Sequence, residues 1–353
     1  MVGGGAERQL LMLVAAQIAR GHEVHVVLGA GGEHYERLRN GRAHVHMVSG
    51  RGSHDPRMLL RIIQLVRKLR PSIIQTWLTQ MDVFGGIAAI VTGTPWVLAE
   101  RSAPEQYGRL KDRVLRRLVA RGADAFVGNS RTGLAYWASH ARRGAIMTLV
   151  KNALPLREIA AAAHTIPADF AAAGNAPLIV YAGRLSAEKN IFLLLDALAV
   201  VCARSTAVAV LCGDGPLRAA IEERIAILGL AERVRVVGFR TDLWAILKAA
   251  TVCVNPSRFE GRPNAVLEAI ACRCPVVVSD IPAHREFLDA STAVFVPVTS
   301  SEGMAQGILS VLAGGASAAL RVEHAAALLS EYEPQVVAAA HDRVYHELLD
   351  TQG

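Results

Sequence analysis

The 353-residue chain has few aromatic residues, few cysteines and no long apolar run. Aromatic residues make up 5% of the chain while hydrophobic residues make up 52%, so its core must consist mainly of Ala, Val, Leu and Ile. That usage is expected of parallel sheets covered by helices on both faces. No uninterrupted apolar stretch reaches the roughly 18 residues of a membrane-spanning helix. The apolar run at 10–19 lacks a preceding basic region, so we interpret it as an amphipathic helix and not as a signal peptide.

The five cysteines are odd in number and include no C-x-x-C pair. Both observations argue against a disulfide framework and against a cysteine-based zinc site. A reducing cytoplasm is the simplest setting for such a chain.

Positive charge is concentrated in the first part of the chain. Up to Pro167 there are 23 Lys and Arg against 11 Asp and Glu, or +12, whereas the remainder carries −5, giving +7 in total. Helical spacing of the basic residues is compatible with simple solvated helix faces, and the alternative is an anionic membrane surface or a lipid-phosphate acceptor. Nucleic acid is not expected, because aromatic residues are not interleaved with the basic ones. The two clusters are Arg61, Arg67, Lys68, Arg70 and Arg109, Lys111, Arg113, Arg116, Arg117, Arg121.

Strand-like and helix-like segments alternate through the chain, which indicates an α/β fold with doubly wound parallel sheets. The alternation lapses at 153–175, an Ala-rich stretch with Pro and Gly that we interpret as a hinge. We therefore expect two Rossmann-like domains facing across a cleft, at 1–152 and 176–332, with a last helix in 333–353 packing back on the first domain. The predicted strands are 23–28, 43–48, 72–77, 95–99, 124–129 and 146–151, then 178–183, 207–212, 233–238, 251–254, 276–279 and 294–296.

The chain opens with a glycine loop that runs directly into a helix at about 6–20. Such a loop normally follows a strand, and here no strand precedes it. The sequence therefore predicts that the first sheet lacks a strand near its middle, as a shortened start would produce. An unprotected edge or a gap should lie beside the strand at 23–28.

The segment 255–271 has the composition of a ligand site at the end of a strand. A buried strand ends there, a turn-rich loop follows, and a helix starts near Pro263, where a missing amide proton is tolerated. The free amides of such a helix start form a cradle for phosphate. Two carboxylates, Glu260 and Glu268, lie eight positions apart in the same segment.

Two other strand ends of the second half carry related features. Arg184 and Lys189 follow the strand at 178–183, where cations would neutralise a departing diphosphate. The turn at 213–216, Gly-Asp-Gly-Pro, has no bulky side chain and permits close backbone approach. Each feature alone is weak, since a lone cation is often solvated and such a turn is often only a turn. Their order within one domain strengthens the interpretation.

With these residues in place, the second half resembles the donor domain of the retaining glycosyltransferases of family 4, which have the GT-B fold. Gly3–Arg8 and Asn129-Ser130 match the acceptor half of that family less tightly. The residues that carry the resemblance are Gly183-Arg184-Leu185, Glu188-Lys189, Gly213–Pro216, Val236–Arg240, Ser257–Ala271 and Pro275–Asp280.

The resemblance implies a role for each matching residue. Glu260 would contact hydroxyls of the transferred sugar, Glu268 would hold the nucleotide ribose, and Arg184 with Lys189 would stabilise the diphosphate leaving group. Because no D-x-D occurs, neither a metal nor another cofactor is expected, and the two cations and a helix N-terminus would substitute for one. The other expected donor-binding residues are Gly4, Gly5, Gly213, Gly261, Asn264, Ala265 and Val266.

The reaction implied is transfer of a sugar from a nucleoside diphosphate to a hydroxyl of a polysaccharide or lipid-linked acceptor, with anomeric configuration retained. It would take place in the cytoplasm, either free or at the inner face of the membrane. A catalytically degenerate nucleotide-sugar-binding protein is the alternative, and a nucleotide-sugar 2-epimerase is less favoured because its acid and base groups have no counterpart. Family members often carry histidines where this chain has Gln75 and Trp77, and often a histidine near Arg101, so the acceptor side departs most from the family pattern.

Overall fold

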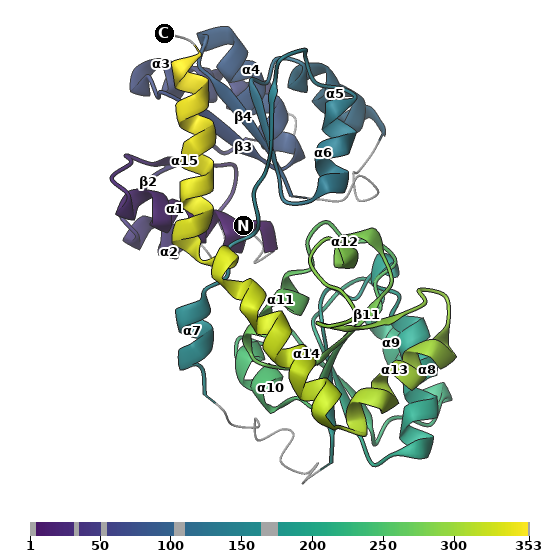
Figure 1. Ribbon diagram of the computed structural model, residues 1–353. Coiled ribbons are helices and arrows are strands. Elements are labelled where there is room, and N and C mark those ends of the chain that lie inside the picture. The colour runs from purple at the N-terminus through teal and green to yellow at the C-terminus, as the bar shows by residue number, and fades with distance from the viewer. Residues whose placement is uncertain (1–4, 32–34, 51–54, 102–109, 164–175, 352–353) are drawn as a thin grey trace. The chain divides into compact units, whose positions relative to one another are not determined.

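The computed structural model describes residues 5–31, 35–50, 55–101, 110–163 and 176–351 of the chain. These residues belong to two compact units, each with its own parallel sheets (Figure 1). Unit 1 comprises Met1–Leu154 and Glu331–Gly353, and unit 2 comprises Pro155–Ser330.

Unit 1 contains two parallel sheets with the strand orders β1-β2 and β3-β4-β5-β6. Its strands are β1 (His25–Leu28), β2 (His44–Met47), β3 (Ile74–Trp77), β4 (Trp96–Glu100), β5 (Ala125–Gly128) and β6 (Ile146–Leu149). Its helices are α1 (Gly5–Ala19), α2 (Tyr35–Asn40), α3 (Pro56–Leu69), α4 (Thr79–Thr92), α5 (Leu110–Ala120), α6 (Arg131–Ala138) and α15 (Pro334–Asp350).

The two sheets of unit 1 are separate. Within the described ranges, β1 pairs only with β2 and β3 pairs only with β4, so no backbone ladder joins the two-stranded sheet to the four-stranded one. The predicted gap beside the strand at 23–28 is therefore confirmed.

The C-terminal helix α15 completes the core of unit 1. It packs against α1 (Figure 1), and Val337 and Val344 are buried with Val97 of β4. Hydrogen bonds also join α15 to β3 and α1. The Tyr345 hydroxyl donates to Gln75 Oε1 over 2.7 Å and accepts from Gln17 Nε2 over 2.8 Å.

Unit 2 is a six-stranded parallel sheet with the order β12-β11-β10-β7-β8-β9 and one apolar core on each face. Its strands are β7 (Leu178–Ala182), β8 (Val208–Cys212), β9 (Val234–Gly238), β10 (Val252–Asn255), β11 (Val276–Ser279) and β12 (Val294–Val296). Its helices are α7 (Leu156–Ala161), α8 (Ile191–Arg204), α9 (Arg218–Ile227), α10 (Leu243–Ala249), α11 (Asn264–Ala271), α12 (Pro282–Arg285), α13 (Ser301–Leu312) and α14 (Ala316–Ala327). Short 3₁₀ turns lie at Ala187–Lys189 and Leu328–Tyr332.

The strand order of unit 2 reverses between β7 and β10. Successive strands β7, β8 and β9 run toward one edge of the sheet, and β10, β11 and β12 run toward the other. Ligands of open α/β sheets bind at such a switch point, outside the carboxyl ends of the strands. A ligand site is therefore expected on the loops after β7 and β10.

The predicted hinge at 153–175 is wrong in its first part. Helix α7 lies within it, and Ile159 is buried in the core of unit 2. Lys248 Nζ donates to the carbonyl of Ala160 over 2.9 Å and to that of Ala162 over 2.6 Å, so the end of α7 is capped from α10. This Ala-rich segment is therefore held on unit 2 by the buried Ile159 and by the Lys248 side chain. Residues 164–175 lie outside the described ranges.

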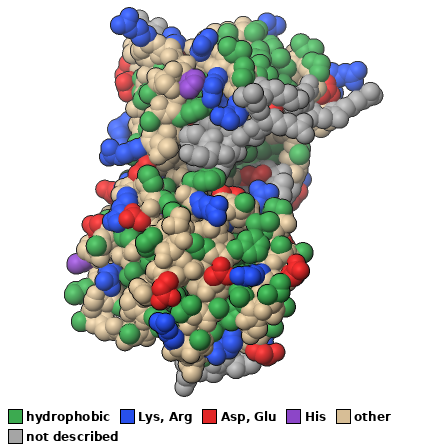
Figure 2. All heavy atoms as spheres, turned by 90° about the vertical axis from the view of Figure 1, so that its right-hand side faces the viewer, with side chains coloured by type: hydrophobic (Ala, Val, Ile, Leu, Met, Phe, Trp, Pro, Cys, Tyr) green, Lys and Arg blue, Asp and Glu red, His purple; other side chains and the backbone are tan. Residues whose placement is uncertain are grey.

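The surface of unit 1 exposes apolar side chains beside basic ones. Val114, Leu115 and Leu118 of α5 are 45%, 42% and 54% exposed, and Ile90 and Val91 at the end of the neighbouring α4 are 53% and 50% exposed. Figure 2 shows hydrophobic side chains gathered near Lys and Arg side chains in the upper part of the molecule.

Within the described ranges no single helix is long and apolar enough to cross a membrane. Only the bent helix pair Ser301–Leu312 and Ala316–Tyr332 has, taken together, the length and composition of a membrane span.

Candidate functional site

A buried ion pair occupies the switch point of unit 2. Strands β7 and β10 are adjacent and parallel, so the loops that follow them emerge side by side. Lys189 comes from the first loop and Glu260 from the second, and Lys189 Nζ lies 2.5 Å from Glu260 Oε1. Their side chains are 16% and 6% exposed, so solvent screens the pair only weakly. The two residues that the sequence predicted from separate strand ends are thus brought together.

Glu260 is held as a carboxylate. Burial disfavours its charged form, but the charge and hydrogen bond of Lys189 and a hydrogen bond from Ser257 outweigh burial, so the pKa of Glu260 lies below its usual value. Ser257 Oγ donates to the same oxygen, Oε1, over 2.8 Å. Both donors use Oε1, and no described side chain donates to Oε2. That oxygen can therefore accept hydrogen bonds from a ligand.

Asn190 fastens the two loops to each other. It has a left-handed backbone conformation (φ +56°), which asparagine tolerates better than most residues. Its Nδ2 donates to the Pro256 carbonyl over 3.2 Å and to the Val298 carbonyl over 3.0 Å, and its Oδ1 accepts from Arg258 Nε over 3.2 Å. The amide of Arg258 donates to the Glu188 carbonyl over 2.9 Å. Lys189 consequently lies in a turn that hydrogen bonds tie to the loops after β10 and β12.

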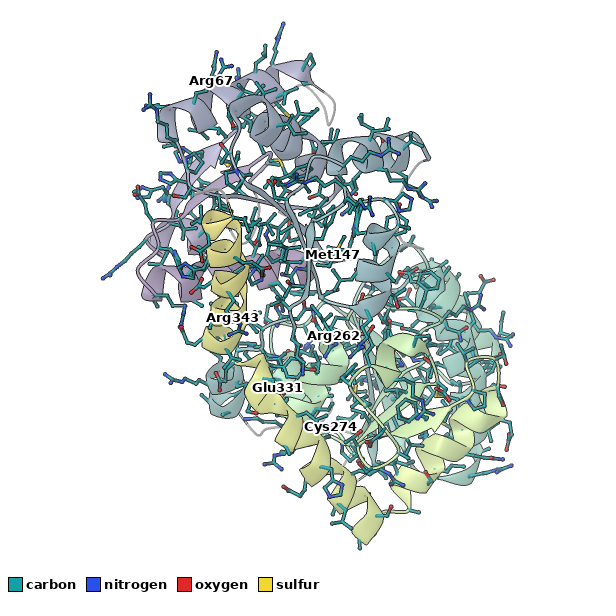
Figure 3. The ribbon with its side chains drawn as sticks, turned by 45° about the horizontal axis from the view of Figure 1, so that its top comes forward. Arg67, Met147, Arg262, Cys274, Glu331 and Arg343 are labelled. Atoms are coloured by element: carbon teal, nitrogen blue, oxygen red, sulfur yellow. The ribbon has the colours of Figure 1, made fainter. Side chains whose placement is uncertain are left out.

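Arg262 anchors the other end of the loop that carries Glu260. Its guanidinium lies 4.6 Å from the ring centroid of Phe287 and 3.5 Å from Glu286, and its side chain is 2% exposed. Figure 3 labels Arg262 in the interior of unit 2, in contrast to Arg67, which projects from the surface of unit 1. Gly261, between Glu260 and Arg262, is buried in the same loop.

Arg184 remains at the surface. Its backbone carbonyl accepts from the Tyr181 hydroxyl over 2.9 Å, which fixes the turn after β7, while its side chain is exposed. The structure therefore does not bring Arg184 to Glu260. It leaves a cation on the same loop as Lys189, available to an anionic ligand.

The turn after β8 packs tightly on the loop after β7. A Cβ at Gly213 (φ +144°) would lie 1.9 Å from the Gly183 carbonyl oxygen, and one at Gly215 would lie 2.4 Å from that of Leu185. The Leu185 amide donates to the Asp214 carbonyl over 2.9 Å. The close backbone approach predicted for this turn is therefore made to a neighbouring loop, and the turn supports the segment that carries Arg184 and Lys189.

The helix after the Glu260 loop starts at Asn264, as the proline pattern predicts. The amide of Val266 donates to the Pro263 carbonyl over 3.1 Å and is used within the helix, whereas the amide of Ala265 has no backbone acceptor in the described part of the chain. Asn264 and Ala265 are partly exposed at this helix start. Glu268, one turn further on, is 3% exposed.

His284 is a residue of this region that the sequence did not single out. It is fully buried in α12, after β11, and its Nδ1 donates to the Ser279 carbonyl over 2.7 Å. The Nε2 atom is therefore an acceptor, and it has no partner among the described residues. Burial lowers the pKa of His284 against the opposing effects of the Ser279 hydrogen bond and the Glu260 charge, which favours the neutral ring. Its position near a strand end was the only available signal.

In unit 1, the positions that depart from the family pattern pack against α15. Gln75 accepts from Tyr345, and the guanidinium of Arg101 lies 4.3 Å from the ring centroid of Trp77. Arg101 also contacts His341 of α15, with 3.3 Å between Nη2 and Nε2, and burial lowers the pKa of Arg101 to about 10. Of the predicted glycines, Gly5 is the exposed first residue of α1, and Gly4 lies outside the described residues.

Two family models match the chain, one on each side of the division between the units. Residues 3–156 match the model described as Glycosyltransferase Family 4, and residues 176–314 match the model described as Glycosyl transferases group 1. The chain belongs to the family 4 glycosyltransferases. Its two α/β units are those of the GT-B fold.

Individual relatives agree with this assignment. The alpha-D-kanosaminyltransferase of Streptomyces kanamyceticus is 30% identical over 136 residues, which cover 37% of this chain and 35% of that protein, so the match spans about a third of that relative. The lipopolysaccharide core biosynthesis glycosyltransferase LpsE of Rhizobium meliloti is 26% identical over 88% of this chain and 86% of its own length. HepE of Anabaena, solved with UDP and glucose, has a TM-score of 0.85 at 21% identity, covering 98% of this chain and 96% of that one.

Proposed function

We propose that this glycosyltransferase moves a sugar from a nucleoside diphosphate sugar to a hydroxyl of a glycan or lipid-linked acceptor, with retention of anomeric configuration and without a metal. The observation that carries the proposal is the buried Lys189–Glu260 pair at the switch point of unit 2, with Glu260 Oε2 open to a ligand. The UDP and glucose bound to HepE and the lipopolysaccharide pathway of LpsE support the donor and acceptor classes by analogy.

Charge neutralisation is the main task of the site. As the bond from the anomeric carbon to the phosphate oxygen breaks, negative charge develops on the diphosphate. Arg184 and Lys189, on one loop, are placed to stabilise it, and the start of α11 adds its partial positive charge. Two side-chain cations supply the charge that a divalent metal supplies in other enzymes.

Glu260 orients the sugar in this scheme and does not attack it. Its Oε1 is engaged by Lys189 and Ser257, which lowers the nucleophilicity of the carboxylate, while Oε2 accepts hydrogen bonds from sugar hydroxyls. The acceptor oxygen then approaches the face that the phosphate leaves. A bond forms between that oxygen and the anomeric carbon, and the hydroxyl proton passes to the departing phosphate.

A panel of UDP-, GDP-, ADP- and dTDP-sugars tests the proposal. We expect release of nucleoside diphosphate from one donor class, slow with water and faster with acceptor, undiminished by EDTA. NMR of the product should show the anomeric configuration of the donor. An inverted product, or full dependence on added Mg²⁺, would contradict the proposed mechanism.

Lys189→Met is the accompanying variant, because its unbranched side chain is close in size to that of lysine and carries no charge. Turnover should fall by at least about 100-fold, as when one electrostatic contact to a transition state is lost. Arg204→Met, on the exposed end of α8, is the control and should retain full activity. Turnover of Lys189→Met within threefold of the parent would remove this residue from the mechanism.

The same panel separates the enzyme from a degenerate binding protein. Such a protein would bind a nucleotide sugar without releasing its nucleotide. The intact Lys189–Glu260 pair favours the enzyme, because a buried ion pair without a task gives little stability over apolar residues.

We also propose that unit 1 binds an anionic membrane surface through α5 and the end of α4. Exposed Leu115 and Leu118 would enter the headgroup region while neighbouring arginines contact lipid phosphates. Arg116 is not among them, because it is buried against Asp82 and Glu100. Flotation with phosphatidylglycerol vesicles should recover the protein at low salt and lose it when Leu115 and Leu118 become Glu. Ile227→Glu, on the exposed surface of unit 2, is the matched control.

A further inference from the structure

A cluster of three histidines and one glutamate lies on one face of the β1–β2 sheet in unit 1, outside the donor site. The strands are parallel, and His25 is in register with His44. Side chains two residues apart share a face of a strand, so Glu23 joins His25 and His46 joins His44. The opposite face carries Val26 and Leu28, which are buried in an apolar core.

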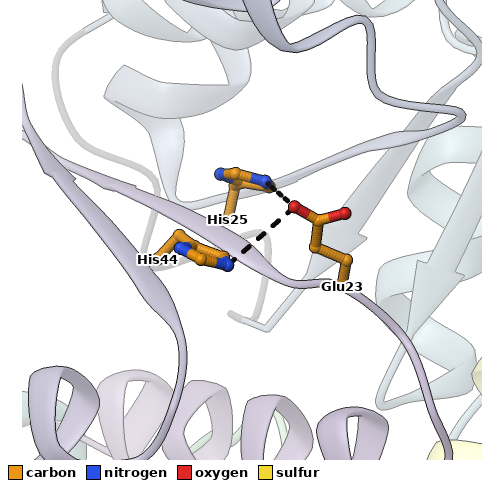
Figure 4. Close-up of side chains that lie close together, drawn as sticks. All are labelled: Glu23, His25 and His44. Carbon is orange, nitrogen blue, oxygen red and sulfur yellow. Dashed lines mark hydrogen bonds and ion pairs between the residues drawn. The ribbon is translucent and has the colours of Figure 1, made fainter.

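The ligand atoms of this cluster are close enough to bind one ion. Glu23 Oε1 lies 3.1 Å from His25 Nε2 and 3.9 Å from His44 Nε2 (Figure 4). The ligand atoms of the three residues all lie within 4.8 Å of one another. Tetrahedral zinc with bonds of about 2.0–2.1 Å to nitrogen needs ligand atoms about 3.4 Å apart. Small side-chain rotations would reach that spacing.

His46 contacts the ring nitrogen of His25 that does not face Glu23. His25 Nδ1 and His46 Nε2 are 2.9 Å apart, while the other nitrogen of His25, Nε2, points to Glu23. Metal-binding histidines commonly use their second nitrogen in such a hydrogen bond, which fixes the tautomer and aims the ligand atom. The cluster therefore has both a ligand set and a supporting residue.

We propose that Glu23, His25 and His44 bind a divalent ion of the zinc class, with His46 as the positioning residue. Two imidazoles and one carboxylate suit Zn²⁺, Ni²⁺ or Cu²⁺ and do not suit Mg²⁺, which prefers oxygen ligands. Three protein ligands leave the remaining position to water. The cluster lies on β1 and β2 of unit 1, whereas the Lys189–Glu260 pair belongs to unit 2, so the proposal is independent of the mechanism of sugar transfer.

The ion would have a structural task. A two-stranded sheet depends for its stability on the elements packed against it, and β1 has no described partner strand on its second side. A metal bridging the segment before β1 and the start of β2 would tie the two strands together. Because the ion would bind the folded protein and not the unfolded chain, the free energy of unfolding would rise with the logarithm of the free metal concentration above the dissociation constant.

Titration of the chelator-treated full chain with Zn²⁺ tests the site. We expect about one ion per chain with affinity in the micromolar range or tighter, a raised melting temperature, and no response to Mg²⁺. With Co²⁺, visible absorption bands of a tetrahedral nitrogen and oxygen site should appear. Donor hydrolysis should be the same with and without the ion.

Variants distinguish the cluster from adventitious surface binding. His44→Ala, at a 57% exposed side chain, should lower Zn²⁺ affinity at least tenfold without unfolding unit 1, and Glu23→Gln should also weaken binding. His46→Phe should weaken it less, because it removes support and not a ligand. His346→Ala, an exposed histidine of α15, is the control. Unchanged affinity in both His44→Ala and Glu23→Gln, or an equal loss in His346→Ala, would overturn the proposal.

Discussion

At the residue scale, the two oxygens of Glu260 have separate tasks. Oε1 is held by Lys189 and Ser257, so the side chain cannot rotate freely, and Oε2 remains open. Removing one member of a buried ion pair leaves the other charge uncompensated, at a cost of about 3–5 kcal/mol. Tests of catalysis at this pair therefore need a measurement of the variant's folding stability beside its turnover.

Glu260→Gln is the sharpest replacement for such a test. It keeps the shape and a hydrogen-bonding oxygen but removes the charge that pairs with Lys189. We expect turnover to fall by about 100-fold or more, because the sugar loses its charged acceptor, while affinity for the free nucleotide changes by less than about threefold. Steady-state kinetics and calorimetric titration with UDP measure the two quantities.

Glu302→Gln, at an exposed position of α13, is the matched control and should leave both quantities unchanged. If Glu260→Gln weakens nucleotide binding and turnover by equal factors, Glu260 acts on the nucleotide and not on the sugar.

Sequence reasoning reached this pair and missed its neighbours for a physical reason. Lys189 and Glu260 follow strands, and parallel strands end at one edge, so their meeting could be predicted before the fold was known. Asn190 depends on a left-handed backbone conformation, and His284 presents a buried ring nitrogen. Amino-acid composition reveals neither feature. The Glu23 cluster depends on the register of β1 with β2, which is equally invisible in the sequence.

At the element scale, the turn after β8 depends on the absence of a side chain at Gly213. Gly213→Ala would place a Cβ 1.9 Å from the Gly183 carbonyl oxygen, so one of the two loops must move. We expect a loss of about 3 kcal/mol in the free energy of unfolding and a weaker nucleotide affinity, because the displaced loop carries Lys189.

Gly229→Ala is the control that introduces backbone strain without a steric collision. Gly229 also has a positive φ (+67°), but nothing lies within 4 Å of its Cβ position. The Gly229→Ala variant should lose only roughly 1–2 kcal/mol of unfolding free energy, the cost of a left-handed backbone in a residue with a Cβ, and its nucleotide affinity should be unchanged. Denaturant unfolding and UDP titration of both variants give the comparison, and equal effects would refute the role of the 213–216 turn as a support.

Helix α5 is joined to α4 and β4 by a buried charge cluster. Arg116 Nη2 lies 2.7 Å from Asp82 and 2.9 Å from Glu100, and the Arg116 guanidinium lies 4.8 Å from the ring centroid of Trp137. Spacing alone assigned Arg116 to a basic surface. The carboxylates that draw it inward come from other elements, which is why a helical pattern could not predict its burial.

Arg116→Leu should destabilise unit 1 by about 3–5 kcal/mol at pH 7, because two buried carboxylates lose their cation. Burial raises the pKa of Asp82 to about 6, with Arg116 opposing the rise, so the variant's folded state takes up a proton more readily still. The folded variant binds this proton at pH values where the unfolded chain does not, so the variant gains more stability than the parent as pH falls from 7 toward 5.

The loss in Arg116→Leu should therefore be smaller at pH 5 than at pH 7 in urea unfolding experiments. Arg121→Leu, an exposed neighbour just beyond α5, should change stability by less than about 0.5 kcal/mol at either pH. A loss that grows toward acid pH would show that Asp82 is not the group responsible.

At the scale of the whole molecule, alternating strand and helix patterns were sufficient to predict two doubly wound sheets and the gap in the first of them. They were not sufficient to locate where one unit ends. The division falls at 154 and again at 330, and α7 joins unit 2 through its buried Ile159 and the hydrogen bonds of Lys248. One anchoring side chain among alanines carries too little periodicity to mark a helix.

The division into units makes a last prediction about nucleotide binding. Every side chain proposed to hold the diphosphate or the ribose belongs to unit 2, on the loops after β7 and β10 and on α11. With saturating UDP, hydrogen exchange should therefore slow most at residues 183–190 and 257–268. Bound ligand at 100 times its dissociation constant adds about 2.7 kcal/mol to the opening free energy of segments that must release it, which corresponds to roughly 100-fold slower exchange.

Glu268→Ala should abolish this slowing of hydrogen exchange at a nucleotide concentration that saturates the parent, whereas Glu302→Ala should not. Slowing confined to β1 and β2 would place the nucleotide in unit 1 and refute the assignment of the donor site.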